Sequence, residues 1–226
     1  GASNVAVGKD SLDSNTTGSN NVAVGMDALQ ANATTSNNTA VGTQALINNI
    51  AADNTALGND AMTANTTGTS NVAVGAAALD ANTTGTGNTS VGKSSLSANT
   101  TADNNTAVGN DALILNTTGA SNVAVGKNAL ESNSTASNNT AVGKSALGAT
   151  TTGTQNTAVG ALSLDANTTA DDNTAVGYQA LTANTTGASN TGIGVNVFQS
   201  NTTGSLNTAV GKGALASNST ADANVA

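Results

Sequence analysis

Small apolar and polar residues alternate over a short run that recurs along the whole chain. The run reads Asn-Thr-Ala-Val-Gly or a close variant, and its glycine is residue 8, 25, 42, 58, 75, 92, 109, 126, 143, 160, 177, 194 and 211. Successive glycines are 17 residues apart, except that Gly42 and Gly58 are separated by 16. A fixed period of this length is typical of solenoid proteins, so we predict one structural coil per repeat.

Each repeat follows the pattern N-T-A-V-G-x-x-A-L-x-A-N-T-T-G-x-x, and we number its positions from 1 to 17. Thirteen units run from Asn4 to Ala223, and Asn224 opens a fourteenth. When the units are aligned on this pattern, position 12 is Asn in every unit except the shortened one and the one containing Thr150. We therefore predict that residues 1–226 form a single continuous repeat array, which begins and ends within a repeat.

The order of residues within a unit predicts short strands and turns. Positions 1–5 predict a strand that ends at glycine, and Ala-Leu-x-Ala-Asn at positions 8–12 predicts a second one. Asn-Thr-Thr-Gly predicts a turn, and the glycine at position 5 is expected to supply a positive φ or to allow a close backbone approach. Helices are not expected, because the unit lacks helical apolar spacing. The prediction is an all-β parallel β-solenoid (β-roll or β-helix) of about 13 coils of 17 residues.

Stacked coils place like residues on like residues, so two apolar columns are expected to form the core. The position-4 column consists of Val7, Val24, Val41, Leu57, Val74, Val91, Val108, Val125, Val142, Val159, Val176, Ile193 and Val210. The position-9 column consists of Leu12, Leu29, Leu46, Met62, Leu79, Leu96, Leu113, Leu130, Leu147, Leu164, Leu181, Phe198 and Leu215. Gly192 and Val197 both replace Ala next to Phe198, which predicts a local exchange of volume.

Each coil has few apolar side chains, and these bury little surface within one chain. We therefore expect further apolar surface to be buried against a partner. Positions 2 and 4 share one face of the predicted strand, and the first is Thr or Val while the second is Val, Leu or Ile. This face is the predicted seam between identical chains.

Composition excludes several classes of function. Cys and His are absent, which removes thiol nucleophiles, disulfides, the usual zinc sites and the commonest general base. The net charge is −8, from 13 acidic residues and five Lys, and Arg is absent, so nucleic-acid binding is not expected. No apolar run is long enough to cross a membrane. We predict no catalytic residue, no metal and no cofactor, and hence no enzyme.

The stretches NTAVGKSAL, NVAVGMDAL and NTAVGYQAL resemble the head repeats of YadA-like trimeric autotransporter adhesins. The longer NTAVGYQALTANTTGASN, residues 173–190, is similar to arrays in phage-tail-fibre-like and bacterial surface proteins. The resemblance covers essentially the whole chain and implies a left-handed parallel β-roll, a trimer and an extracellular fibre that serves attachment. The unit differs from the usual head unit, because it is longer by its Asn-Thr-Thr turn.

Together these features predict a structural segment of an extracellular fibre or filament, on a cell or virion surface, that serves adhesion. The expected partners are copies of the chain, as a homotrimer or an end-to-end filament, and a host-surface or glycan receptor. The alternative is an ice-binding β-solenoid that uses Thr and Asn arrays. The paired Thr of the turn are adjacent and cannot both face one flat side, and the position-2 Thr column is interrupted by Val in four units.

The turns also carry Asn-x-Ser/Thr triplets, the acceptor pattern for N-linked glycans. These triplets begin at Asn15, Asn32, Asn65, Asn82, Asn99, Asn116, Asn133, Asn167, Asn184, Asn201 and Asn218. The alternative is unmodified turns, because Asn and Thr are good turn formers and can make side-chain ladders. All five Lys stand at position 6, and most acids stand at positions 7, 10 and 16, where solvated faces are expected.

Overall fold

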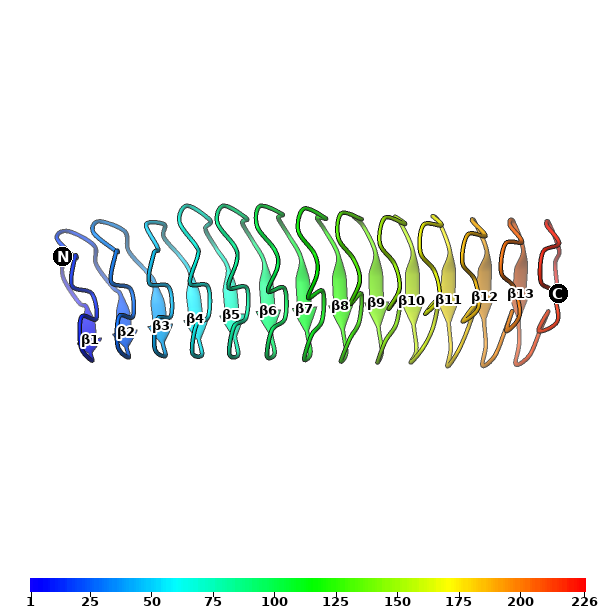
Figure 1. The fold of residues 1–226 in the computed structure, drawn as a ribbon, viewed down its shortest axis with the longest axis horizontal. Helices are drawn as coiled ribbons and strands as arrows, with labels where there is room; N and C mark the ends of the chain where they lie inside the picture. Colours follow the sequence, from blue (N-terminus) through cyan, green and yellow to red (C-terminus); the bar gives the residue numbers. More distant parts are fainter. The chain divides into compact units, whose positions relative to one another are not determined.

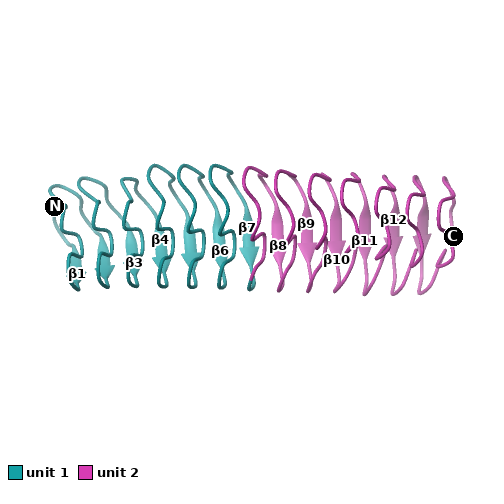
Figure 2. Cartoon of the chain, viewed as in Figure 1, with its two compact units in different colours: residues 1–110 teal, residues 111–226 magenta.

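The computed structural model describes residues 1–226 and contains thirteen three-residue strands and no helix. It divides into two compact units, residues 1–110 and 111–226 (Figure 2). The strands of the first unit are β1 (Val5–Val7), β2 (Val22–Val24), β3 (Thr39–Val41), β4 (Thr55–Leu57), β5 (Val72–Val74), β6 (Thr89–Val91) and β7 (Thr106–Val108). The strands of the second are β8 (Val123–Val125), β9 (Thr140–Val142), β10 (Thr157–Val159), β11 (Thr174–Val176), β12 (Thr191–Ile193) and β13 (Thr208–Val210).

Within each unit, every strand pairs in parallel with the next one along the chain (Figure 1). Partners are 17 residues apart, as in Ala158 and Ala175, and 16 apart across the shortened coil, as in Ala40 and Ala56. Each repeat is therefore one coil, and each coil stacks on its neighbour in register. The predicted all-β parallel β-solenoid with a 17-residue period is confirmed.

Backbone hydrogen bonds between coils continue beyond the strands. The amide of Leu79 donates to the carbonyl of Ser95 at 3.0 Å, and the amide of Ala81 donates to Ser97 at 3.1 Å. In the turn, the amide of Thr83 donates to the carbonyl of Thr100 at 2.8 Å. Much of each coil's perimeter is thus paired, although only three residues per coil form a strand.

Positions 8–11 form a turn and position 12 lies outside any strand, so the expected second strand is wrong. The residue at position 9 has a left-handed backbone in every coil, as shown by Leu79 with φ 54° and Leu130 with φ 51°. Position 7 is also left-handed in every coil, for example Ala77 with φ 52°. Two left-handed residues so close together are incompatible with an extended strand and curl the chain inward.

The interior holds the residues at positions 3, 8 and 9. In the fifth coil these are Ala73, Ala78 and Leu79, all fully buried. The position-9 residues are buried in every coil except the last, where Leu215 is partly exposed, so the structure supports this half of the expected core.

The position-4 column lies outside the core, contrary to expectation. None of its thirteen members is buried, and Val7 and Val210 are 57% and 61% exposed. Side chains alternate between the two faces of a strand, and the alanine at position 3 occupies the inner face. Positions 2 and 4 therefore point outward. The interior is narrow, so the strand contributes only the small Ala of position 3, and Leu at position 9 fills the remaining space.

Glycine at position 5 meets both expected requirements. Gly75 has φ +136°, and a Cβ built on it would lie 2.5 Å from the carbonyl oxygen of Gly92 in the next coil. The exchange of volume in the twelfth coil also has a structural reason. A Cβ on Gly192 would lie 3.1 Å from both the Phe198 and the Val197 side chains, so these larger residues need the glycine.

Candidate functional surfaces

Two columns of asparagine side chains form hydrogen-bonded ladders inside the coils. In the fifth coil, Asn71 at position 1 and Asn82 at position 12 both donate their side-chain amides to the carbonyl of Gly85, at 2.8 and 3.0 Å. The side-chain oxygen of Asn71 also accepts the backbone N–H of Asn88 in the next coil, at 2.9 Å. The position-1 column therefore closes each coil and joins it to the next. The unbroken column of Asn at the start of every strand is consistent with the expectation that like residues stack on like residues.

The position-12 ladder links neighbouring coils directly through side chains. The Nδ2 of Asn82 donates to the Oδ1 of Asn65 at 2.8 Å, and the Nδ2 of Asn65 donates to Asn49 at 2.7 Å. Asn49 thus occupies position 12 of the shortened coil, which corrects the expected gap in the column. The missing residue lies in the turn, where Ile50 alone replaces two threonines. Thr150 is then the sole replacement in the column.

The predicted N-glycan acceptors are the members of this ladder. All eleven donate Nδ2 to the carbonyl of the residue three positions later, at 2.8 to 3.2 Å. Nine are fully buried: Asn32, Asn65, Asn82, Asn99, Asn116, Asn133, Asn167, Asn184 and Asn201. Asn15 and Asn218 are partly exposed. Because Nδ2 is the atom to which an N-linked glycan is attached, the folded coils do not present these nine acceptors to solvent.

The outward face of the strands is a stripe without charge. Position 2 is Thr or Val and position 4 is Val, Leu or Ile in every coil of both units. Among its members, Leu57 is 47% exposed and Ile193 is 41% exposed. Exposed apolar residues in a continuous row are typical of interaction surfaces, and this stripe is the predicted seam.

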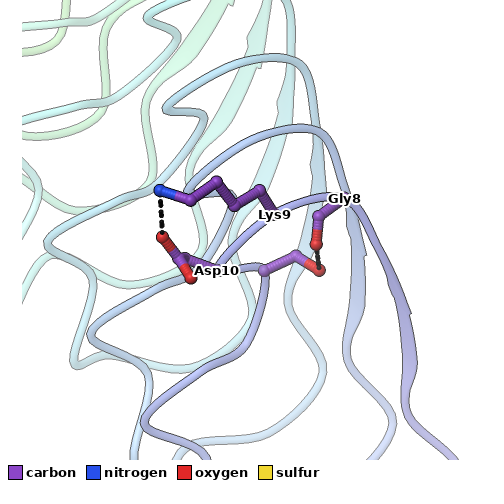
Figure 3. A network of polar contacts seen from close by, with 4 residues as sticks. Gly8, Lys9 and Asp10 are labelled. Atoms are coloured by element: carbon purple, nitrogen blue, oxygen red, sulfur yellow. Dashed lines mark hydrogen bonds and ion pairs between the residues drawn. The ribbon is translucent and has the colours of Figure 1, made fainter.

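Charged side chains lie mainly at the turns. The five lysines at position 6 are exposed, as predicted. The Lys9 ammonium lies 3.0 Å from the Asp10 carboxylate, and this contact raises the pKa of Lys9 (Figure 3). Many acids at positions 7 and 17 have a local explanation, since these residues have positive φ, which Asp and Asn tolerate better than most. Asp60, with φ 57°, is one of them.

Two aspartates at position 10 are partly buried. Burial raises the pKa of Asp80, and repulsion from Asp60 adds to the effect. Burial also raises the pKa of Asp165, and Glu131, two coils away, adds to that shift. A Cβ built on Gly148, in the coil between them, would lie 2.7 Å from the Asp165 carboxylate. The Asp165 carboxylate therefore lies where a side chain at residue 148 would otherwise be.

Neither unit contains a pocket, and no three acidic side chains gather at one place. The chain has no helix with the length and hydrophobicity needed to cross a bilayer. Comparisons of the chain with protein-family models, with curated proteins and with solved structures find no match. The two surfaces that the coils offer repeatedly are the outward strand face and the tip of the Asn-Thr-Thr turn.

Proposed function

We propose that the chain is a structural segment of an extracellular fibre or filament, in which copies associate through the outward strand face. The observation that carries the proposal is the uncharged, largely apolar stripe at positions 2 and 4. A β-solenoid is well suited to such a role, because each coil repeats the same surface at a regular spacing of about 4.8 Å.

A second copy is the partner that this stripe fits best. The stripe has the period of the coil itself, so it matches another copy of the chain along its length. The chain carries a net charge of −8, yet no charged residue lies at positions 2 or 4. Copies can therefore approach on this face without placing like charges in contact, and they would bury side chains such as Val74 and Val91, which are partly exposed in one chain.

The assembly that we propose is a homotrimer, as the resemblance to autotransporter heads implies, with an end-to-end filament as the alternative. Adhesion is the proposed purpose, because a repeated surface can bind a host-surface or glycan receptor many times and add weak contacts into strong attachment. A structural role without catalysis is supported by the regular coil surface, which offers no concave site where reacting groups could converge.

Light scattering on the purified chain tests self-association. We expect a mass that is a multiple of 21.5 kDa at about 100 µM chain; at such concentrations only contacts stronger than about 5 kcal/mol remain populated. Val74→Asp combined with Val91→Asp should yield monomers with unchanged circular dichroism. Ala76→Asp adds a charge at exposed position 6 of one of the same coils and should leave the mass unchanged. A monomeric wild-type chain, or association that survives the paired substitution, would overturn the seam.

Adhesion is tested separately with microspheres that carry the chain at high or low density on an epithelial cell layer. Attachment that rises more steeply than density is the expected signature of many weak contacts. Equal attachment of coated and uncoated microspheres would refute adhesion and leave the seam to be decided by the scattering experiment.

Ice binding is the second candidate, and one observation favours it. In five consecutive coils of the second unit, position 2 is Thr and position 4 is Val or Ile, so hydroxyl and methyl groups form parallel rows on one sheet face. The hydroxyls of Thr140, Thr157 and Thr174 make no hydrogen bond within the chain and are free to bind water. Measurable thermal hysteresis that Thr157→Lys abolishes would support this function, and its absence at millimolar concentration would exclude it.

A further inference from the structure

The threonine at position 14, at the tip of the turn, is exposed in every coil that contains it. This column occurs in all twelve full-length coils and is absent only from the shortened one. Its members are Thr17, Thr34, Thr67, Thr84, Thr101, Thr118, Thr135, Thr152, Thr169, Thr186, Thr203 and Thr220. Eleven of them are the threonine of an Asn-x-Thr triplet and so lie two residues after an asparagine of the position-12 ladder, whereas Thr152 follows Thr150.

The adjacent position 13 provides a comparison within the same turn. There the hydroxyl is used by the coil: Thr66 donates to the carbonyl of Thr83 at 2.9 Å, and Thr83 donates to Thr100 at 3.0 Å. Nevertheless Ala33, Ser134 and Ser219 replace threonine at this position in full-length coils. The position-14 hydroxyls make no hydrogen bond within the chain, yet position 14 is always threonine in a full-length coil.

Packing and turn geometry do not account for this uniformity. Position 14 has no positive φ that would restrict the residue type, and a solvent-exposed turn accepts Ser, Asn, Asp or Gly as readily as Thr. Exposed position 6 varies widely, with Lys, Met, Asn, Ala, Tyr and Val among its members. A hydroxyl that contributes no bond to the fold but recurs at one exposed place indicates a use at the surface.

We propose that the position-14 threonines are acceptors for O-linked glycosylation. The Thr84 Oγ1 would attack the anomeric carbon of a nucleoside-diphosphate sugar held by a glycosyltransferase. The new Oγ1–C1 bond forms as the bond from C1 to the diphosphate oxygen breaks, the nucleoside diphosphate leaves with that electron pair, and the hydroxyl proton passes to a base of the transferase. The coil contributes the acceptor and its presentation.

The backbone holds this acceptor in place on both sides. The amides of Thr83 and Thr84 both donate to the carbonyl of Thr100, at 2.8 and 3.3 Å, and Gly85 at position 15 is buried. The hydroxyl therefore projects from an anchored turn flanked by small residues, where a transferase can reach it. The amide of Asn82, at the other end of the same triplet, is inaccessible because it is fully buried and bonded.

A neutral sugar suits this row better than a phosphate. Neighbouring hydroxyls follow the coil spacing of about 4.8 Å, and two unit charges at that distance repel by about 1 kcal/mol even in water. Phosphates carry about −1.5 to −2 charges each, so a phosphorylated row would repel itself several times more strongly. The chain already has a net charge of −8.

Intact-mass spectrometry of the chain isolated from the organism that makes it tests the proposal. We expect the mass to exceed that of the unmodified polypeptide by multiples of one sugar residue, and peptide fragmentation to place the sugars on position-14 threonines. In the same host, Thr84→Val should lose the sugar at that site alone, while Thr83→Val, the matched control at position 13, should retain it. An unmodified mass, or sugars placed on the Asn side chains or on position 13, would overturn the proposal. The result does not depend on self-association, which light scattering measures independently.

Discussion

Thr150 leaves the side-chain oxygen of Asn133 without a hydrogen-bond partner in the interior of the second unit. Asn133 is fully buried, and its own Nδ2 donates to Asn116 at 2.7 Å, as the ladder requires. The next residue of the column has no amide to donate. Instead, the Thr150 hydroxyl donates to the backbone carbonyl of Asn167 at 3.0 Å. A buried acceptor without a partner costs about 1–3 kcal/mol, so the ladder is weakened at this step.

Replacing Thr150 with Asn should restore the ladder and stabilise the protein. The new Nδ2 can donate to the orphaned Asn133 oxygen, and the new Oδ1 can accept from Asn167. We expect a gain of about 1 kcal/mol in the free energy of unfolding, measured by urea titration. Thr150→Val is the matched control, because it keeps the shape but supplies no amide, and it should destabilise. A loss of stability in Thr150→Asn would show that the column does not act as a continuous ladder.

Glycine at position 5 should be irreplaceable wherever another coil follows it. Gly194 has φ +142°, and a Cβ on it would lie 2.5 Å from the Gly211 carbonyl oxygen. Gly211 has φ +127° but no atom within 4 Å of the same point. Gly211→Ala should therefore cost only the backbone strain, about 1–3 kcal/mol, whereas Gly194→Ala should cost clearly more. Thermal unfolding of both variants measures the difference, and equal losses would contradict the steric role of the next coil.

The period of the repeat was enough to predict the coil, the parallel register and the buried column that includes Leu79. The inner and outer faces of the strand could not be assigned in the same way, because Ala and Val are both apolar. The choice depends on the width of the interior, which admits Ala73 and turns Val74 outward. The left-handed φ of 54° at Leu79 could not be predicted from the sequence either, since bulky residues rarely adopt it. It is tolerated here because the side chain becomes fully buried.

Only the glycan-acceptor interpretation of the position-12 asparagines places their amides at the surface, and it does so for a related reason. An isolated Asn in an interior is unfavourable, and sequence patterns therefore place it outside. Its burial becomes favourable only when each amide meets a partner in the next coil, as Asn65 and Asn82 do. That condition is a property of the stack and not of any single repeat.

Truncation of Leu130 and of Val125, in the same coil, should separate the core from the outward face. Leu130 is fully buried, so Leu130→Ala should cost about 2–5 kcal/mol in the free energy of unfolding. Val125 faces outward and is only partly buried in one chain, so Val125→Ala should cost less than Leu130→Ala in dilute, monomeric samples. At concentrations where copies associate, Val125→Ala should weaken association, which sedimentation velocity measures. Equal losses in dilute solution would place Val125 in the core after all.

Replacing Asp165 with Asn should stabilise the protein at neutral pH and have little effect at about pH 3. Burial, with a smaller contribution from Glu131, raises the pKa of Asp165 in the folded state, while the unfolded chain keeps a pKa of about 3.9. Between these two values the folded state holds the extra proton, so the stability contributed by Asp165 is present below the unfolded pKa and is lost as the pH rises through the folded one. Asn cannot ionise, so the variant should escape that loss.

Two control variants complete the comparison. Glu131→Gln removes the repulsion alone and should give a smaller gain at pH 7. Asp172→Asn, at an exposed turn, is the control for removing one negative charge. Urea titrations of the four proteins at pH 3 and pH 7 make the comparison. If Asp165→Asn were less stable than the wild type at pH 7, the ionised carboxylate would have to be stabilising, contrary to its position over Gly148.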